Sequence, residues 1–278
     1  MEYLVKTLNV ILFISCCLFT SCNKEDIPET ANQRFNQSMK WNEQHPYQEI
    51  VVPSDNYRII SIADIHVGST ENLDLFVNKA KTMLPAAVVF VGDLTSTGKA
   101  EDLTRFENHL PDRSSLNYLL IAGNHDLYSG GWSEFYKKFG ASTFMFTIKT
   151  PIASDLFICL ETGGFTLGRD QFDWLKKTLE VLRPGYRRCI IFTHVNFFRT
   201  RHTFSTNPFS EEVTALLAMF FMNNVDMVVT GHDHEHSIET FANTNYIIMD
   251  ALVDGFSQAG YLNLNVLNGK IDYSFSKL

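Results

Sequence analysis

The chain has 278 residues, of which 45% are hydrophobic and 19% charged, and its formal net charge at pH 7 is −8. A chain of this size folds as one globular domain with a full core, with or without a terminal extension. The negative charge repels a phosphate backbone. It therefore argues against general nucleic-acid binding and leaves any phosphate affinity to a local source such as metal ions.

The first 22 residues have the features of an export signal. Lys6 supplies a positive charge, and the apolar run of residues 8–20 is too short to span a bilayer as a helix. Small residues precede Cys22 and charges follow it at residues 24–26, which resembles the lipobox of bacterial lipoproteins. The resemblance implies that Cys22 is lipidated and that the protein is an exported outer-membrane lipoprotein, periplasmic or surface-facing. A simple secretory signal is the alternative.

Residues 23–52 are polar and lack the alternation of a strand. We therefore expect a polar tether there, with a short helix over residues 33–44 that packs on the fold through Phe35 and Trp41. Residues 53–278 are expected to form the globular domain.

Strand and helix patterns alternate from residue 57 onward. Strands are predicted over residues 57–63, 86–91, 116–122, 143–148, 156–160, 189–193 and 225–230. Helices are predicted over residues 72–83, 99–109, 132–139, 169–183 and 210–223, the last with Ser210 as its N-cap. The remaining chain offers only strands, over residues 237–241, 246–249, 261–266 and 271–275. An α/β part followed by a β-only part predicts a layered fold with sheets at its centre.

The cysteines of the body, Cys159 and Cys189, lie in apolar runs. We expect buried, reduced thiols there in preference to a disulfide. No cysteine spacing predicts a zinc–thiolate site.

Side chains that bind metals or transfer protons stand at the ends of five predicted strands. They are Asp64 and His66; Asp93; Asn124, His125 and Asp126; His194; and His232 and His234. Each cluster alone has an ordinary alternative as a helix cap, a turn, a structural histidine or a solvated loop. Together they predict one site, because the carboxyl ends of strands form the ligand crevice of α/β sheets. These ligands, with one carboxylate shared, suit two divalent ions such as Mn, Fe or Zn.

The order of the clusters resembles the signature of the calcineurin-like metallophosphoesterases. The matching motifs are Asp64-x-His66, Gly92-Asp93, Gly123-Asn124-His125-Asp126, His194 and Gly231-His232-x-His234. Residues 168–179 also resemble the Gln-x-x-Trp-Leu helix of a bacterial branch of this family. That branch includes class III cyclic-nucleotide phosphodiesterases and is similar to purple acid phosphatases. The resemblance implies a four-layer α/β/β/α sandwich with a central β-sandwich and a di-metal site at strand carboxyl ends.

The resemblance also implies a role for each motif residue. One ion would be held by Asp64, His66, Asp93 and His234, and the second by Asp93, Asn124, His194 and His232. His125 would protonate the leaving oxygen, and Asp126 would orient His125. Two such ions lower the pKa of a bridging water, and the resulting hydroxide attacks phosphorus in line. The expected activity is thus metal-dependent hydrolysis of a phosphomono- or phosphodiester.

The substrate is less well defined by the sequence. No Arg follows the Gly92-Asp93 motif closely, and Asp126 replaces the Glu of protein Ser/Thr phosphatases, which argues against a phosphoprotein substrate. We expect a small phosphoester. Besides Asn124, the candidates for binding its phosphate are Arg199, Arg201 and His202, with a solvated loop as the alternative.

Three further residues are left with open roles. Tyr128 and Trp132 could stack on a base or sugar or pack in the core, and His236 lies outside the motif. For the whole chain, the alternative is a catalytically inactive cell-surface binding or scaffold protein that retains the fold. The intact set of motif residues favours an enzyme.

Overall fold

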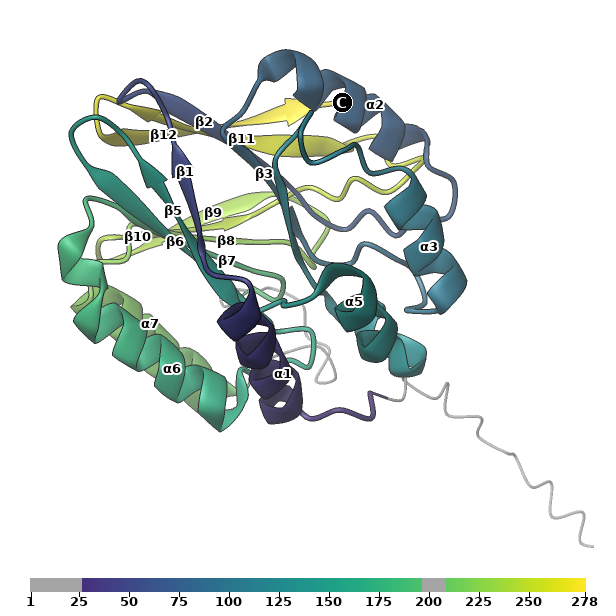
Figure 1. The fold of residues 1–278 in the computed structure, drawn as a ribbon, viewed down its shortest axis with the longest axis horizontal. Helices are drawn as coiled ribbons and strands as arrows, with labels where there is room; N and C mark the ends of the chain where they lie inside the picture. The colour runs from purple at the N-terminus through teal and green to yellow at the C-terminus, as the bar shows by residue number, and fades with distance from the viewer. Residues whose placement is uncertain (1–26, 197–208) are drawn as a thin grey trace, which may run out of the picture.

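Two β-sheets pack face to face between helices in the computed structural model, which describes residues 27–196 and 209–278 (Figure 1). One sheet has the strand order β1-β5-β6-β7-β8-β10-β9, and the other has the order β12-β11-β2-β3-β4. The strands are β1 (Gln48–Val51), β2 (Tyr57–Ile62), β3 (Ala87–Val91), β4 (Tyr118–Ile121), β5 (Phe144–Lys149), β6 (Ser154–Leu160), β7 (Cys189–Thr193), β8 (Met227–Thr230), β9 (Ser237–Phe241), β10 (Thr244–Ile248), β11 (Gly260–Leu267) and β12 (Lys270–Lys277).

The helices form the two outer layers. They are α1 (Ala31–Gln44), α2 (Glu71–Met83), α3 (Ala100–Asn108), α4 (Asn124–Leu127), α5 (Gly131–Phe139), α6 (Gly168–Val181) and α7 (Ser210–Met222). In Figure 1, α2, α3 and α5 cover the outer face of the five-stranded sheet, whereas α6 and α7 cover that of the seven-stranded sheet. The expected α/β/β/α sandwich is therefore confirmed.

The central strands are buried on both faces. In β3, Val88 and Phe90 pack beneath the helices, whereas Val89 and Val91 face the other sheet. Neighbouring side chains of a strand point to opposite faces, so a strand inside two layers must be apolar throughout. This is why β3 and β7 appear in the sequence as unbroken apolar runs.

Parallel pairing brings the functional loops together. Strands β2, β3 and β4 pair in parallel in one sheet, and β6, β7, β8 and β10 do so in the other. The carboxyl ends of parallel neighbours lie at the same edge, so the loops after β2, β3, β4, β7 and β8 meet. The amide of Asp64 donates to the carbonyl of Gly92 (3.1 Å), which joins the first two of these loops.

Most elements agree with the sequence-based prediction, with small shifts at their ends. Among the strands and α-helices, β1 and the single-turn helix α4 were missed. The N-cap of α7 is Phe209 instead of Ser210. Ser210 is the first helical residue, and its hydroxyl donates to Glu211.

The thiols of Cys159 and Cys189 are buried and unpaired as expected, and burial raises the pKa of Cys189 to about 12. Within the described part of the chain, no helix has the length and apolar character needed to cross a membrane.

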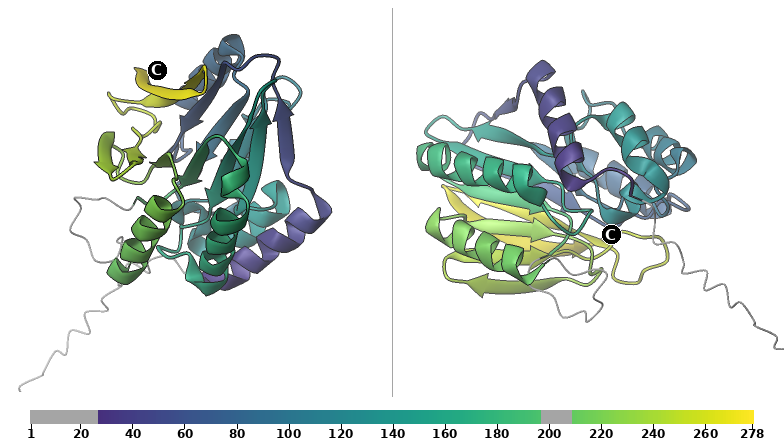
Figure 2. Two further views of the ribbon diagram at one scale, coloured as in Figure 1. Left: turned by 90° about the vertical axis from the view of Figure 1, so that its left-hand side faces the viewer. Right: turned by 90° about the horizontal axis from the view of Figure 1, so that it is seen from below.

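From residue 27, where the described part begins, the structure corrects the expectation of a polar tether, whereas the helix expected there to pack through Phe35 and Trp41 is confirmed. Helix α1 begins with a capping box in which Thr30 and Gln33 bond each other's backbone amides, and β1 pairs with β5 in parallel. Figure 2 (right) shows α1 between α6 and α5. Phe35 is buried against Trp174 (ring centroids 6.0 Å apart), so from Ala31 onward this segment belongs to the domain.

A buried ion pair fixes α1 to the sheet. The Nε of Arg34 donates to Glu161 at 2.7 Å, and both side chains are only 1% exposed. Glu161 directly follows β6 and also accepts from the amide of Gly163 at 2.6 Å. A charge removed from water in this way depends strongly on its partner.

We predict that Arg34→Met lowers the free energy of unfolding by about 3–5 kcal/mol, because it leaves the Glu161 carboxylate buried without its cation. The double variant Arg34→Met/Glu161→Leu should recover most of this loss, since neither charge is then buried. Urea denaturation measures both. Arg169→Met is the control, because the side chains of Arg169 and its partner Asp173 are 87% and 65% exposed. A double variant less stable than the single one would contradict this role.

Candidate metal centre

The predicted ligands converge where the five loops meet. Three groups of side chains have ligand atoms within 4.8 Å of one another. The groups are Asp64, His66 and His234; His66, Asp93 and His125; and Asp93, His194 and His232. The first and the third of these, hereafter the first and the second ligand group, reproduce the two ligand sets that the sequence implied, apart from Asn124 and the shared Asp93.

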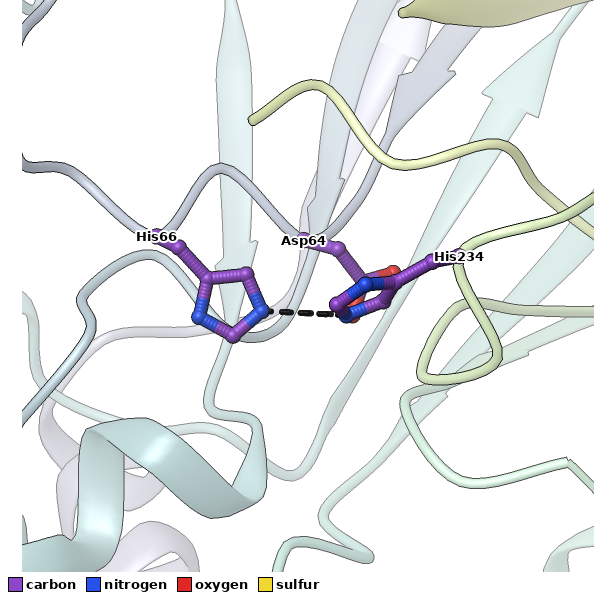
Figure 3. Close-up of side chains that lie close together, drawn as sticks. All are labelled: Asp64, His66 and His234. Atoms are coloured by element: carbon purple, nitrogen blue, oxygen red, sulfur yellow. Dashed lines mark hydrogen bonds and ion pairs between the residues drawn. The ribbon is translucent and has the colours of Figure 1, made fainter. Parts of the chain in front are cut away.

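The first group joins the loop after β2 to the loop after β8. The Nε2 atoms of His66 and His234 lie 3.1 Å apart, and Nε2 of His234 lies 3.4 Å from Oδ1 of Asp64. Figure 3 shows the two imidazoles facing each other beside the Asp64 carboxylate. The same carboxylate accepts from the amide of His232 (2.8 Å to Oδ2), so Asp64 also fixes the backbone of the second loop.

The second group lies deeper. Nε2 of His194 is 3.2 Å from Oδ2 of Asp93 and 3.1 Å from Oδ1 of Asn124. The Nδ1 of His194 bonds the carbonyl of Val91 at 2.9 Å. That bond sets the tautomer, because a hydrogen on Nδ1 leaves Nε2 of the neutral ring with a lone pair for an ion.

Asp93 lies between the two groups. Its Oδ1 accepts from the amide of His125 at 2.8 Å. Its Oδ2 lies 3.6 Å from Nε2 of His66 and 3.2 Å from Nε2 of His194. One carboxylate oxygen therefore faces both groups, as a bridging ligand requires.

These spacings fit the binding of divalent ions. Two ligand atoms on one tetrahedral ion at about 2.0–2.2 Å lie roughly 3–3.5 Å apart. The distances of 3.1 and 3.4 Å in the first group, and of 3.1 and 3.2 Å in the second, lie in this range. Imidazole, carboxylate and amide donors without thiolate suit Mn, Fe or Zn.

The backbone at the site is held in an uncommon conformation. Five candidate ligands have positive φ: Asp64 (53°), His66 (45°), Asp93 (50°), His232 (74°) and His234 (66°). Such values are rare outside glycine, although Asp and His tolerate them best, and they persist only where the surroundings enforce them.

Glycines permit the close approach of these loops. A Cβ on Gly123 would lie 2.2 Å from the amide nitrogen of Asp93, and one on Gly231 would lie 2.5 Å from Oδ2 of Asp64. The glycines of the Gly-Asn-His-Asp and Gly-His motifs are thus required by packing.

The electrostatics favour positive charge inside the site. Burial alone would lower the pKa of His194, but the carboxylates of Asp93 and Asp64 raise it to about 10. Burial alone would raise the pKa of Asp93, but His194 and His66 hold it well below its usual range. Burial lowers the pKa of His66, which favours the neutral ring that binds metals. The two carboxylates therefore favour cations among these side chains.

The predicted role of Asp126 is wrong. The Nδ1 of His125 bonds the carbonyl of Ser96 at 2.8 Å, so a backbone group orients the imidazole. Asp126 instead accepts from the amides of Leu94 (3.1 Å), Thr95 (2.8 Å) and Gly123 (2.9 Å), which ties the loop after β3 to the loop after β4. Burial and the nearby Asp93 raise the pKa of Asp126 to about 6. The Ser96 carbonyl could not have been found from the sequence, because every residue carries one.

The remaining candidates have varied positions. Trp132 is fully buried and donates to Gln37 at 2.6 Å, so it is a core residue. His236 bonds Asp250 through its amide (3.0 Å) and through Nδ1 (2.7 Å), beside the ligand loop. Tyr128 is buried next to Asn124 and His125. The candidates that lie outside the described residues are Cys22, Arg199, Arg201 and His202.

Comparison with known proteins agrees with the family resemblance of the sequence motifs. A model of the calcineurin-like phosphoesterase family matches residues 57–236. A Bos taurus transmembrane protein with a metallophosphoesterase domain is 28% identical over 94 residues, which are 33% of this chain and 21% of that protein. The match thus spans about a fifth of that relative's length.

Solved structures resemble this chain at low sequence identity, and two of them show the extent of the likeness. GAP50, the anchor in the inner membrane complex of Plasmodium, has a TM-score of 0.64 and 13% identity, over 80% of this chain and 84% of that chain. A dimetal phosphatase from Danio rerio has a TM-score of 0.62 and 12% identity, over 79% and 95%. At these identities the likeness shows a shared fold.

We predict that the wild-type chain binds two divalent ions and that Asp93→Ala loses both, because each ligand group loses the same carboxylate. Metal analysis after dialysis at a fixed free Mn²⁺ or Zn²⁺ concentration measures the stoichiometry. The control is Asp74→Ala, since Asp74 also bonds an imidazole, Nδ1 of His109 at 2.7 Å, but belongs to none of the three groups. Two tightly bound ions in Asp93→Ala would refute the bridging role.

Proposed function

Since residues 57–236 match that family model, the chain belongs to the calcineurin-like phosphoesterase family, and we propose that it is a metal-dependent hydrolase of small phosphomono- or phosphodiesters. The observation that carries this proposal is the carboxylate of Asp93 between two ligand groups, with a proton donor beside it. Nε2 of His125 lies 4.0 Å from Oδ2 of Asp93, and the side chain of His125 is 34% exposed. A substrate that reaches the ions therefore also reaches His125.

Two bound divalent cations supply Lewis-acid chemistry, since they stabilise negative charge on phosphoryl oxygens and make water a stronger nucleophile. Asp64, His66, Asp93 and His234 would hold one ion, and Asp93, Asn124, His194 and His232 the other.

His125 is the proposed general acid. With a hydrogen on Nδ1 bonded to the carbonyl of Ser96, the ring can donate from Nε2 only as an imidazolium, and that carbonyl stabilises the positive charge. The hydroxyl of Ser96 donates to the carbonyl of His66 at 2.8 Å. Ser96 thus links the acid to the first ligand group, and this linkage keeps Nε2 directed at the leaving oxygen.

The proposed substrate is a small phosphoester whose charge is complemented by the ions and by Arg199, Arg201 and His202. The competing proposal is a binding or scaffold protein that keeps the fold without catalysis, as the anchor role named for the Plasmodium protein would suggest. An assay with chromogenic phosphomono- and phosphodiesters and added Mn, Fe or Zn separates the two proposals. Metal binding without hydrolysis of either ester class would favour the scaffold.

We also propose that the protein is exported and anchored to a membrane by lipid on Cys22. The apolar run of residues 8–20, followed by Cys22 and the charges of residues 24–26, supports this proposal. Several acyl chains on one cysteine would satisfy the requirement for more than one chain in stable anchoring. Since α1 begins at Ala31, only residues 23–30 separate the cysteine from the domain. Eight residues span at most about 29 Å, so the domain would lie close to the bilayer.

We predict that His125→Ala retains both ions but reduces kcat by about 10²–10⁴-fold, the usual contribution of general acid–base catalysis. The loss should be smaller for p-nitrophenyl esters than for alkyl esters, because a good leaving group needs little protonation. The control is His109→Ala, which removes an imidazole that is bonded to Asp74 and belongs to none of the ligand groups. Equal losses for both ester types would exclude His125 as the acid.

We predict that Cys22→Ser releases the protein from membranes or leaves its signal uncleaved. Cell fractionation and the mass of the mature protein test this. Cys16→Ser and Cys17→Ser are the controls, since further apolar residues follow these cysteines and they should not be lipidated. A Cys22→Ser variant with wild-type fractionation and mature mass would refute the lipid anchor.

A further inference from the structure

We propose that Tyr128 is a positioning residue for two members of the site, holding the amide of Asn124 through its hydroxyl and the imidazole of His125 through its ring. The inference rests on the proposed function, because it assigns Asn124 to the second ion and the acid role to His125. Tyr128 belongs to none of the ligand groups, so its role would be to position Asn124 and His125.

The hydroxyl acts on Asn124. Nδ2 of Asn124 donates to Oη of Tyr128 at 2.5 Å, while Oδ1 lies 3.1 Å from Nε2 of His194 and faces the second ligand group. Asn124 is 2% exposed and Tyr128 is 8% exposed, so this bond is shielded from water. Only the oxygen of an amide can bind a cation, because both hydrogens are on the nitrogen. Holding Nδ2 at Tyr128 therefore keeps Oδ1 aimed at the second ion.

The ring acts on His125. The rings of Tyr128 and His125 have centroids 4.5 Å apart and planes inclined by 50°. The ring of His66 approaches His125 from another direction, also at 4.5 Å and nearly perpendicular (88°). With Nδ1 bonded to Ser96, these two rings restrict rotation of the imidazole. Nε2 therefore keeps its position relative to Asp93.

The backbone is built to bring Tyr128 to this place. Tyr128 follows the single-turn helix α4 four residues after Asn124, so both side chains lie on the same side of the turn. A Cβ on Gly98 would lie 2.2 Å from the carbonyl oxygen of Tyr128. Only glycine at that position lets Tyr128 lie against the loop after β3. Because Tyr128 is buried, the structure favours positioning over the stacking on a substrate base that the sequence left open.

Tyr128→Phe tests the hydroxyl, since it removes the acceptor of the Asn124 amide and keeps the ring. Titration of the metal-free protein with Mn²⁺ by calorimetry, or with Co²⁺ by visible absorption, should show a second ion bound about 10–100-fold more weakly and a first ion unchanged. The control is Tyr57→Phe, which removes another buried hydroxyl, bonded to Asp155 at 2.6 Å, at the amino end of β2. It should lower stability without changing either affinity.

A double-mutant cycle tests whether the hydroxyl acts through Asn124. In an Asn124→Ala background, adding Tyr128→Phe should leave the affinity for the second ion unchanged, because the amide is already absent. The full additional loss in that background would overturn the proposal, as would wild-type affinity for both ions in Tyr128→Phe alone.

Tyr128→Leu tests the ring. It should reproduce the metal loss of Tyr128→Phe and, at saturating metal, reduce kcat more for alkyl esters than for p-nitrophenyl esters, because the acid is then poorly placed. Equal loss for both esters would overturn the claim about His125. If the wild-type chain itself binds no metal or hydrolyses no ester, the proposed function fails instead, so the two failures are distinguishable.

Discussion

The position of one buried carboxylate, that of Asp93, is the constraint on which the rest of the site depends. Oδ2 of Asp93 must face two ligand groups at once, and this restricts the conformation of the loop that carries it. Three features hold Asp93 in this position. Its φ is positive, its Oδ1 accepts a hydrogen bond from the amide of His125, and Gly123 has no side chain that would collide with it. Asp126 completes it, since its carboxylate bonds backbone amides of both adjoining loops. Pairing of β3 with β4 in parallel makes the two loops neighbours.

A second constraint is electrostatic. The carboxylates of Asp64 and Asp93 are buried, and among the described residues their ion-pair partners are imidazoles, with no Lys or Arg. Burying such charge is unfavourable unless a positive charge compensates it. The same carboxylates raise the pKa of His194, which favours positive charge at that imidazole. Divalent ions would supply the compensating positive charge, so metal binding and the stability of the folded state are linked.

The N-terminal segment is part of the same architecture. Arg34 extends from α1 to Glu161 at the end of β6, where the chain begins the loop that precedes α6. Phe165 in that loop packs edge-on against His232, with ring centroids 5.7 Å apart. Helix α1 thus supports a wall of the metal centre. If the chain is anchored at Cys22 as proposed, this wall would lie only a short stretch of chain away from the point of attachment.

The sequence by itself determined the chemistry and most of the elements. Side chains that can bind metals or transfer protons leave a pattern in the chain when they stand at strand ends, and this pattern marks the candidates Asp64, His66, Asp93, Asn124, His125, His194, His232 and His234. Apolar runs such as that of β3 mark strands buried on both faces. Only the tertiary structure decided what orients those side chains. The carbonyl of Ser96 leaves no mark in a sequence, and the carboxylate of Asp126 has the same identity whether it bonds a neighbouring imidazole or backbone amides. Likewise, the strand β1 and the ion pair of Arg34 depend on long-range partners, β5 and Glu161, that local periodicity does not reveal.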